Sequence, residues 1–139
     1  MLDYSIWIEK IGVIQWFAFG TALLVALAII GIGVGYIANP MAATRSFGLP
    51  LPESGVNIIW WLRLKGVRDI VSGLIVLAFV AWGSPRGVGL IMLIEALIPI
   101  GDMLLILAAG GSTKSAFGIH GITALLMVSA GIPMMIGAH

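Results

Sequence analysis

The chain is dominated by four long apolar runs, which are separated by short stretches rich in glycine, proline and polar residues. At about 1.5 Å per residue, each run is long enough as a helix to cross roughly 30 Å of hydrocarbon. The composition agrees, because 60% of the 139 residues are hydrophobic, only 9% are charged, and the mean hydropathy is +1.15. The sequence predicts an all-α, integral-membrane four-helix bundle in a single domain spanning 1–139, with spans at about 14–37, 58–82, 88–109 and 116–136.

The connections between the runs predict how the helices are arranged. The turn at Gly83–Gly87 is so short that the second and third spans are expected to be antiparallel neighbours. The longest connection, Asn39–Asn57, is rich in proline and glycine and is expected to be a loop. An even number of crossings places both chain ends on one side. Arg45 and Lys114 favour cytoplasmic first and third connections, by a small excess of positive charge.

Small residues recur within the spans at spacings that share a helix face, and such residues let helix backbones approach closely in lipid. We therefore expect helix contacts at three glycine pairs: Gly31 with Gly35, Gly66 with Gly73, and Gly118 with Gly121.

Ionisable residues interrupt the spans. The stretch "WWLRLKGVRDIVSGLIVLAF" begins with three cations and Asp69, and later spans carry Glu95, Asp102 and His120. A charge at the centre of the bilayer costs about 2.5–3.5 kcal/mol even on the most lenient scale, so these side chains are expected to face the bundle interior.

Spacing and depth predict which charges meet. Lys65 and Asp69 are four residues apart, and Glu95 and Asp102 are seven apart, so each pair shares one face of its helix. Counted from the side of the first and third connections, the charged faces of the second and third spans lie at overlapping depths in the membrane. This overlap predicts that Lys65 or Arg68 pairs with Asp102 and that Arg68 pairs with Glu95. Two cations against three acids leave one carboxyl that is expected to keep its proton. A buried ion-pair network that only fixes helix register is the alternative.

Two further residues bear on the predicted site. Pro99 cannot donate to the carbonyl of Glu95, which predicts a kink in the third span. His120 is expected either to fill space or to act as a proton donor or acceptor. Since Glu95 and Asp102 are too far apart along one helix to chelate an ion, no metal is expected, and no cofactor.

Other function classes are excluded by composition. The chain has no cysteine, which removes disulfides and thiol chemistry, and a net charge of +1 provides no basic field for nucleic acid. The N-terminal segment lacks the basic lead of a secretory signal and is expected to remain in the mature protein. Its apolar residues predict either a short helix at the headgroups or a frayed end: Leu2, Ile6, Trp7 and Ile11.

Three features resemble a family of small four-span membrane proteins of unknown function and, more distantly, the DoxX-like group. They are "FGLP" at Phe47–Pro50, "LKGVRDIVSGL" at Leu64–Leu74, and the acidic third span with Glu95 and Asp102. The resemblance implies a four-helix bundle with Arg68 and Asp69 at its centre, and it implies no activity. The absence of cysteine argues against the thiol-redox role of some DoxX-like proteins.

The sequence therefore predicts a small membrane enzyme that acts on a lipid-soluble molecule, by isomerisation, cyclisation or epoxide opening. Its expected catalytic residues are Asp69, Glu95 and Asp102, and its expected binding residues are Lys65, Arg68 and His120. A proton-coupled transporter is the second hypothesis, and it implies a homo-oligomer because four spans enclose little space. A non-catalytic accessory subunit, whose charges only pair helices among membrane lipids, is the third.

Overall fold

The computed structural model describes residues 12–136, and within this range every regular element is helical. The described part of the chain forms an all-α, membrane-type helical bundle, which confirms the predicted fold class. The predicted N-terminal helix around Leu2 and Ile6 lies outside the described residues. The elements in chain order are α2 (Val13–Ala38), α3 (Pro40–Phe47), α4 (Val56–Trp82), α5 (Pro85–Glu95), α6 (Leu97–Ala108), α7 (Thr113–Ser115), the π-helical turn η1 (Ala116–Gly121) and α8 (Ile122–Ile136).

Three helical segments are long and apolar enough to cross a membrane: Val13–Ala38, Pro85–Ala108 and Thr113–Ile136. The second predicted span, 58–82, corresponds to α4, which is 27 residues long but carries four charged residues in its first half. Each predicted boundary lies within three residues of the observed one. Hydrophobic length therefore located all four long segments.

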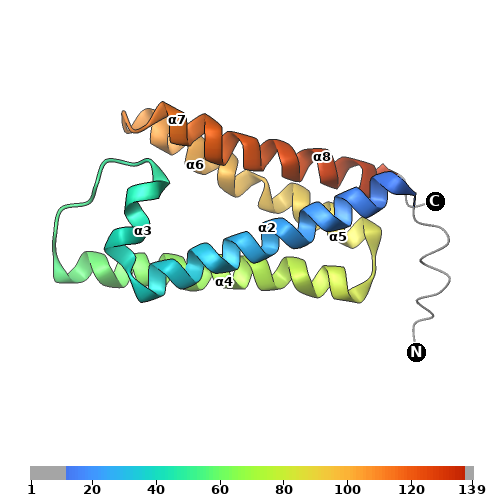
Figure 1. Cartoon of the computed structure of the whole chain (residues 1–139), viewed down its shortest axis with the longest axis horizontal. Coiled ribbons are helices and arrows are strands. Elements are labelled where there is room, and N and C mark those ends of the chain that lie inside the picture. The colour runs from blue at the N-terminus through green and yellow to red at the C-terminus, as the bar shows by residue number, and fades with distance from the viewer. Residues whose placement is uncertain (1–11, 137–139) are drawn as a thin grey trace.

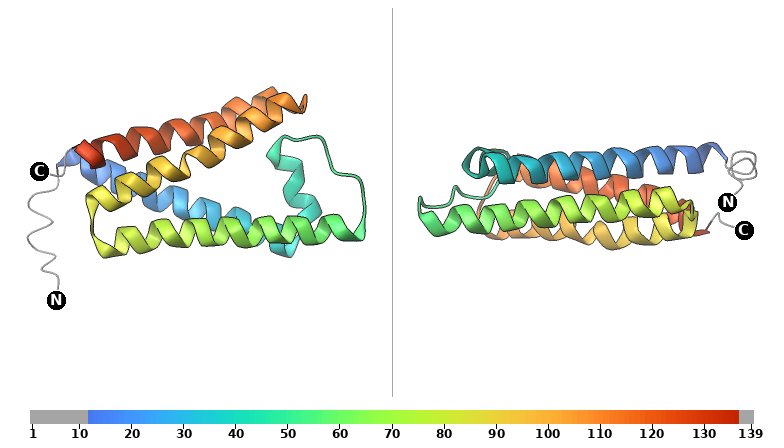
Figure 2. Two further views of the ribbon diagram at one scale, coloured as in Figure 1. Left: turned by 180° about the vertical axis from the view of Figure 1, so that it is seen from behind. Right: turned by 90° about the horizontal axis from the view of Figure 1, so that it is seen from below.

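The long segments form two antiparallel pairs (Figures 1 and 2). One pair is α2 with α4, and the other is α5 and α6 with α8. Contacts between α2 and α8 join the pairs. The two pairs lie close together near the α4–α5 turn and diverge toward the other end, where α3 lies between them (Figure 1).

The hydrophobic core fills the end where the pairs converge. Its fully buried side chains include Val76, Val88, Met92, Met127 and Met134. The ionisable residues lie in the other half of the bundle, where the pairs diverge.

Glycines set the close approach within each pair. A Cβ atom on Gly33 would lie 2.6 Å from the carbonyl oxygen of Gly66, and one on Gly73 would lie 2.6 Å from that of Ala26. In the other pair, a Cβ atom on Gly89 would lie 2.8 Å from the carbonyl oxygen of Gly131. Side chains at these positions would push the helices apart.

The glycine predictions are thus correct for α4 and wrong for α2. Gly66 and Gly73 make the expected close contact, but a Cβ atom on Gly31 or Gly35 would meet nothing within 4 Å. The contact residue is Gly33, and residues two positions away on a helix point about 200° from it. Of the third predicted pair, Gly118 also faces open space, whereas Gly121 lies against Met103.

The first connection, predicted to be a loop throughout, contains the helix α3, and that prediction is wrong there. The Asn39 side chain caps the helix by accepting a hydrogen bond from the Ala42 N–H at 3.3 Å, and a proline occupies the first helical position. Gly48 ends the helix with a φ of 105°, a conformation that glycine adopts without strain. The Gly48 carbonyl then accepts a hydrogen bond from the Ser112 N–H at 2.8 Å, so α3 bridges the two helix pairs at the open end.

Candidate functional site

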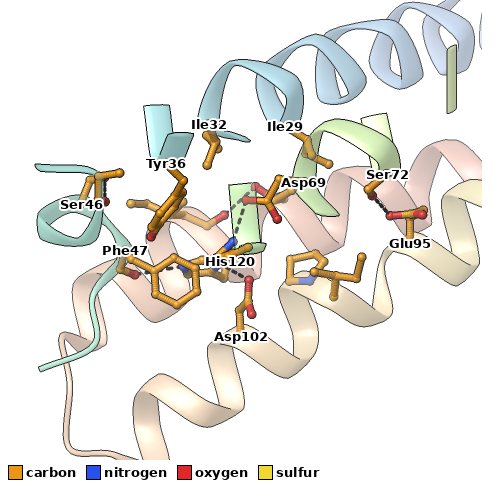
Figure 3. Close-up of a pocket in the computed structure, with 16 residues that line it drawn as sticks. Ile29, Ile32, Tyr36, Ser46, Phe47, Asp69, Ser72, Glu95, Asp102 and His120 are labelled. Carbon is orange, nitrogen blue, oxygen red and sulfur yellow. Dashed lines mark hydrogen bonds and ion pairs between the residues drawn. The ribbon is translucent and has the colours of Figure 1, made fainter. Parts of the chain in front are cut away.

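A cavity of about 300 Å³ lies in the divergent half of the bundle (Figure 3). Residues of α2, α3, α4, α5, α6, η1 and α8 line it. Most of its wall is apolar, and five of the six site residues predicted from the sequence line it. The lining residues are Ile29, Ile32, Tyr36, Ala43, Ser46, Phe47, Lys65, Asp69, Ser72, Glu95, Ile98, Pro99, Asp102, Ile119, His120 and Thr123.

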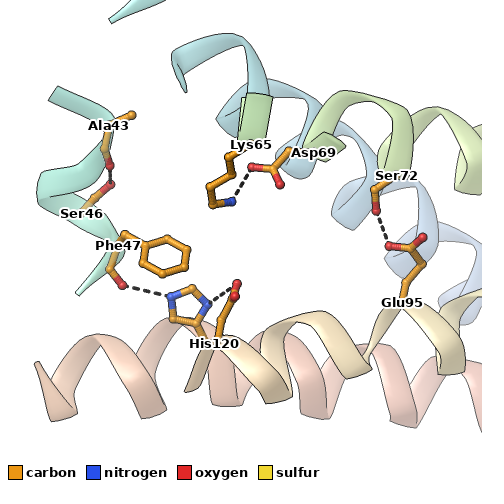
Figure 4. A network of polar contacts seen from close by, with 9 residues as sticks. Ala43, Ser46, Phe47, Lys65, Asp69, Ser72, Glu95 and His120 are labelled. Carbon is orange, nitrogen blue, oxygen red and sulfur yellow. Dashed lines mark hydrogen bonds and ion pairs between the residues drawn. The ribbon is translucent and has the colours of Figure 1, made fainter. Parts of the chain in front are cut away.

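Lys65 and Asp69 form an ion pair on one face of α4, with Nζ 2.7 Å from Oδ2 (Figure 4). The Lys65 ammonium also lies 4.9 Å from the centre of the Tyr36 ring and 5.1 Å from that of Phe47. Two aromatic faces and a carboxylate thus stabilise this cation. The predicted shared face is correct, whereas the predicted pairing of Lys65 with Asp102 is wrong because Asp69, one turn away, occupies the ammonium.

His120 and Asp102 form a second pair on the opposite wall. The Nε2 atom of His120 donates a hydrogen bond to the Phe47 carbonyl at 3.0 Å, and Nδ1 lies 3.5 Å from Oδ2 of Asp102. The Phe47 ring packs edge-on against the imidazole, with centroids 4.8 Å apart. His120 is only 8% exposed, so its ring is held from several sides.

This geometry restricts where protons reside. A carbonyl can only accept, so Nε2 carries a proton. Nδ1 faces the Asp102 carboxyl, so a proton on either group can pass to the other when the two approach. A separation of 3.5 Å is long for a hydrogen bond, as is common for acid–base groups before substrate binds.

The position of His120 depends on an irregular helix turn. Residues Ala116–Gly121 form a π-helical turn, which widens the helix by one residue per turn. Such a turn changes the direction in which its side chains point relative to a regular α-helix, and π-turns are frequent at functional sites. No feature of the sequence analysis indicated this π-helical turn.

Glu95 lies deeper in the bundle and is 8% exposed. Its Oε2 accepts a hydrogen bond from the hydroxyl of Ser72 on α4 (Figure 4). The predicted pairing of Glu95 with Arg68 is therefore wrong: the partner on α4 is a neutral hydroxyl. Glu95 is also the last residue of α5, and the chain turns at Ala96 before α6 begins. The interruption lies three residues before Pro99, and Ala96 itself keeps helical backbone angles, so the kink expected from that proline stays a prediction.

Arg68 is the predicted site residue that lies outside this cavity. It is exposed and makes no ion pair within 4.0 Å with any residue that the structure describes. On α4 it points about 60° away from Lys65 and about 100° away from Asp69, toward the flank of the helix. There it lines a second cavity of about 300 Å³. Consequently only Asp69 of the Arg68–Asp69 pair faces the main cavity.

Three lining residues that contact the charged side chains were not predicted: Tyr36, Phe47 and Ser72. Ser72 continues the face of Lys65 and Asp69 at helical spacing, so its position was available from the sequence. Phe47 belongs to the quoted "FGLP" stretch, but its role depends on α3. Tyr36 had no signal beyond being a polar aromatic residue in an apolar span. In residues 12–136 no three His, Cys, Asp or Glu side chains gather closely enough to hold a metal ion.

Comparison with known proteins gives one match. No curated protein and no solved structure matches the chain. The more distant resemblance to the DoxX-like group stays a prediction. A family model matches residues 26–134, which include every residue lining the cavity, and its description is "Domain of unknown function (DUF4267)". The chain belongs to this family of unknown function.

Proposed function

We propose that the protein is a membrane enzyme that moves protons on a lipid-soluble small molecule bound in the main cavity. The observation that carries the proposal is the pair of Asp102 and His120, whose Oδ2 and Nδ1 atoms lie 3.5 Å apart on the wall of a largely apolar cavity. Isomerisation is the reaction that this arrangement supports best, because it needs a positioned acid and base and no cofactor.

Apolar side chains favour a lipid-soluble substrate. Three isoleucines that line the cavity keep about half of their surface exposed: Ile32 is 50%, Ile98 49% and Ile119 46% exposed. Contact with these side chains favours an apolar molecule.

The polar groups suit a proton shift next to a carbonyl. The Asp102–His120 pair, as a base, removes a proton from one carbon, and a proton is returned to another carbon, so that the product has the same atoms as the substrate. The Lys65 ammonium faces the same cavity and stabilises the negative charge that develops on the carbonyl oxygen between the two steps. Glu95 is a second carboxyl within the cavity wall that can hold the returning proton.

This proposal includes a fourth membrane crossing by α4. The helix is 27 residues long and packs along α2, whose length and hydropathy suit a crossing. Lys65 and Asp69 neutralise each other inside the bundle, which lowers the cost of placing this helix in hydrocarbon.

Deuterium exchange tests the proposal without a known substrate. Purified protein in lipid nanodiscs is incubated with a total lipid extract in D₂O, and the extract is analysed by mass spectrometry. An acid–base isomerase makes at least one lipid-soluble compound gain deuterium at carbon. Asp102→Asn and His120→Gln are expected to reduce this exchange at least 100-fold, in line with the usual contribution of a general acid or base. Glu53→Gln, an exposed carboxylate outside the cavity, is the matched control and should leave it unchanged.

Two results would contradict the enzyme. Deuterium exchange that persists in both Asp102→Asn and His120→Gln would show that the Asp102–His120 pair does not catalyse it. Uptake of a compound into proteoliposomes that depends on a pH gradient, with no deuterium at carbon, would favour a proton-coupled transporter instead.

A further inference from the structure

Arg68 differs from every acidic residue of the site in having no charged or hydrogen-bonding partner among the described residues. Asp69 is paired with Lys65, Asp102 lies beside His120, and Glu95 accepts from Ser72. The positive charge of Arg68 is therefore not neutralised by the site itself.

The position of Arg68 makes this charge costly in a bilayer. It lies twelve residues after Val56, the first residue of α4, which is about 18 Å along the helix axis. An uncompensated arginine within the hydrocarbon costs at least about 2.5–3.5 kcal/mol. A bound anion would remove much of this cost.

A cavity is present where that anion would lie. The second cavity, about 300 Å³ in volume, is lined by Arg68 together with Trp61 and Leu64. It adjoins the main cavity, because both are lined by the same five residues: Lys65, Asp69, Ser72, Ile98 and Asp102. A molecule with an anionic end beside Arg68 can therefore extend its apolar part toward the Asp102–His120 pair.

On this basis, and resting on the proposed function, we propose that the substrate is a lipid-soluble carboxylic acid whose carboxylate binds Arg68 in the second cavity. A guanidinium binds a carboxylate through two parallel N–H···O hydrogen bonds, and a single arginine matches its single charge. A long-chain acid enters hydrocarbon in its neutral form and gives its proton to a carboxylate of the cavity wall, Asp102, when it pairs with Arg68. The phosphate of a phospholipid is permanently charged and stays at the membrane surface.

Binding of palmitic acid, compared with methyl palmitate, tests this assignment in nanodiscs of phosphatidylcholine. The ester has the same chain and no charge. The protein is expected to bind the acid at least tenfold more tightly than the ester. Arg68→Gln should abolish this preference by weakening binding of the acid alone, and Arg68→Lys should keep part of it because the charge remains. Arg86→Gln removes an exposed cation at the other end of the bundle and should leave the preference intact.

Equal binding of the acid and the ester would overturn the assignment, as would an acid preference that survives Arg68→Gln. Displacement of palmitic acid by phosphatidylglycerol would also overturn it, because the cavity would then be a phospholipid site. Binding of the ester reports whether Arg68→Gln is folded. If that variant binds neither compound, the acid-to-ester binding ratio of Arg68→Lys is used instead. A ratio below that of the unmodified protein supports the assignment, and an unchanged ratio overturns it. The assay involves no turnover, so its failure is distinct from failure of the deuterium exchange.

Discussion

Glu95 shows how a single residue combines burial with an unusual partner. It is the most buried carboxylate that the structure describes, and its hydrogen bond comes from Ser72, a neutral residue on another helix. A buried acceptor that loses its donor keeps its full desolvation cost. The Ser72–Glu95 hydrogen bond is therefore expected to tie α4 to α5.

Ser72→Ala is accordingly expected to lower the free energy of unfolding by about 1–3 kcal/mol. The double variant Ser72→Ala/Glu95→Leu removes both partners and should recover much of this loss. Reversible unfolding in mixed detergent micelles measures both values. Ser129→Ala is the control, because Ser129 is exposed and its hydroxyl donates only to the Leu126 carbonyl of its own helix. If Ser72→Ala changes stability no more than the control does, this hydrogen bond does not stabilise the bundle.

For single residues, the sequence predicted which side chains line the cavity better than which side chains contact one another. Helical spacing and depth correctly placed Lys65, Asp69, Glu95, Asp102 and His120 along one cavity. They did not determine the direction of each side chain around its helix axis. Arg68 shows the consequence, since it has the depth required to meet Glu95 but points toward the flank of α4.

Among the helices, the α2–α4 contact depends on glycine at defined positions. Gly33→Ala would place a methyl group against the Gly66 carbonyl, and we expect a loss of about 1–3 kcal/mol in the free energy of unfolding. Gly31→Ala in the same helix is the matched variant, because its methyl group meets open space. It should leave stability unchanged or raise it by up to about 1 kcal/mol through better helix propensity. Equal losses in the two variants would contradict the observed packing.

The long helices were predictable and the short ones were not, for a physical reason. A membrane-crossing helix is specified by the length of its apolar run, which is a local property of the sequence. The helix α3 and the π-turn at His120 are stabilised by contacts between distant segments, such as those of Gly48 with Ser112 and of Phe47 with His120. Asn39, Pro40 and Gly48 are local signals for the start and end of α3, but its place between the helix pairs and the π-turn depend on those distant contacts.

For the whole molecule, the two helix pairs meet at one end and diverge at the other, with the cavity in the divergent half (Figure 2). This shape places the first and third connections at the same end, as the Ser112–Gly48 hydrogen bond shows. The α4–α5 turn lies at the opposite end. A bilayer around the bundle would therefore place the first and third connections on one side of the membrane and the α4–α5 turn on the other.

Because the chain has no cysteine, single thiols report this arrangement directly. We expect Glu53→Cys and Lys114→Cys to react with a membrane-impermeant thiol reagent from one side of a sealed vesicle, and Arg86→Cys from the other. All three positions are exposed. Labelling of Glu53→Cys and Arg86→Cys from the same side would show that α4 does not cross the membrane.

The distance between Asp102 and His120 tests the proposed site most directly, because the two side chains come from α6 and η1, which must pack together to bring them close. Solid-state NMR on protein in bilayers, with ¹³C at aspartate carboxyls and ¹⁵N in histidine rings, measures the dipolar coupling between Cγ of Asp102 and Nδ1 of His120. The 3.5 Å separation of Oδ2 from Nδ1 predicts one coupled aspartate signal that disappears in Asp102→Asn. Absence of any aspartate–histidine coupling would show that the acid and the base do not meet, and the proposed chemistry would have no site.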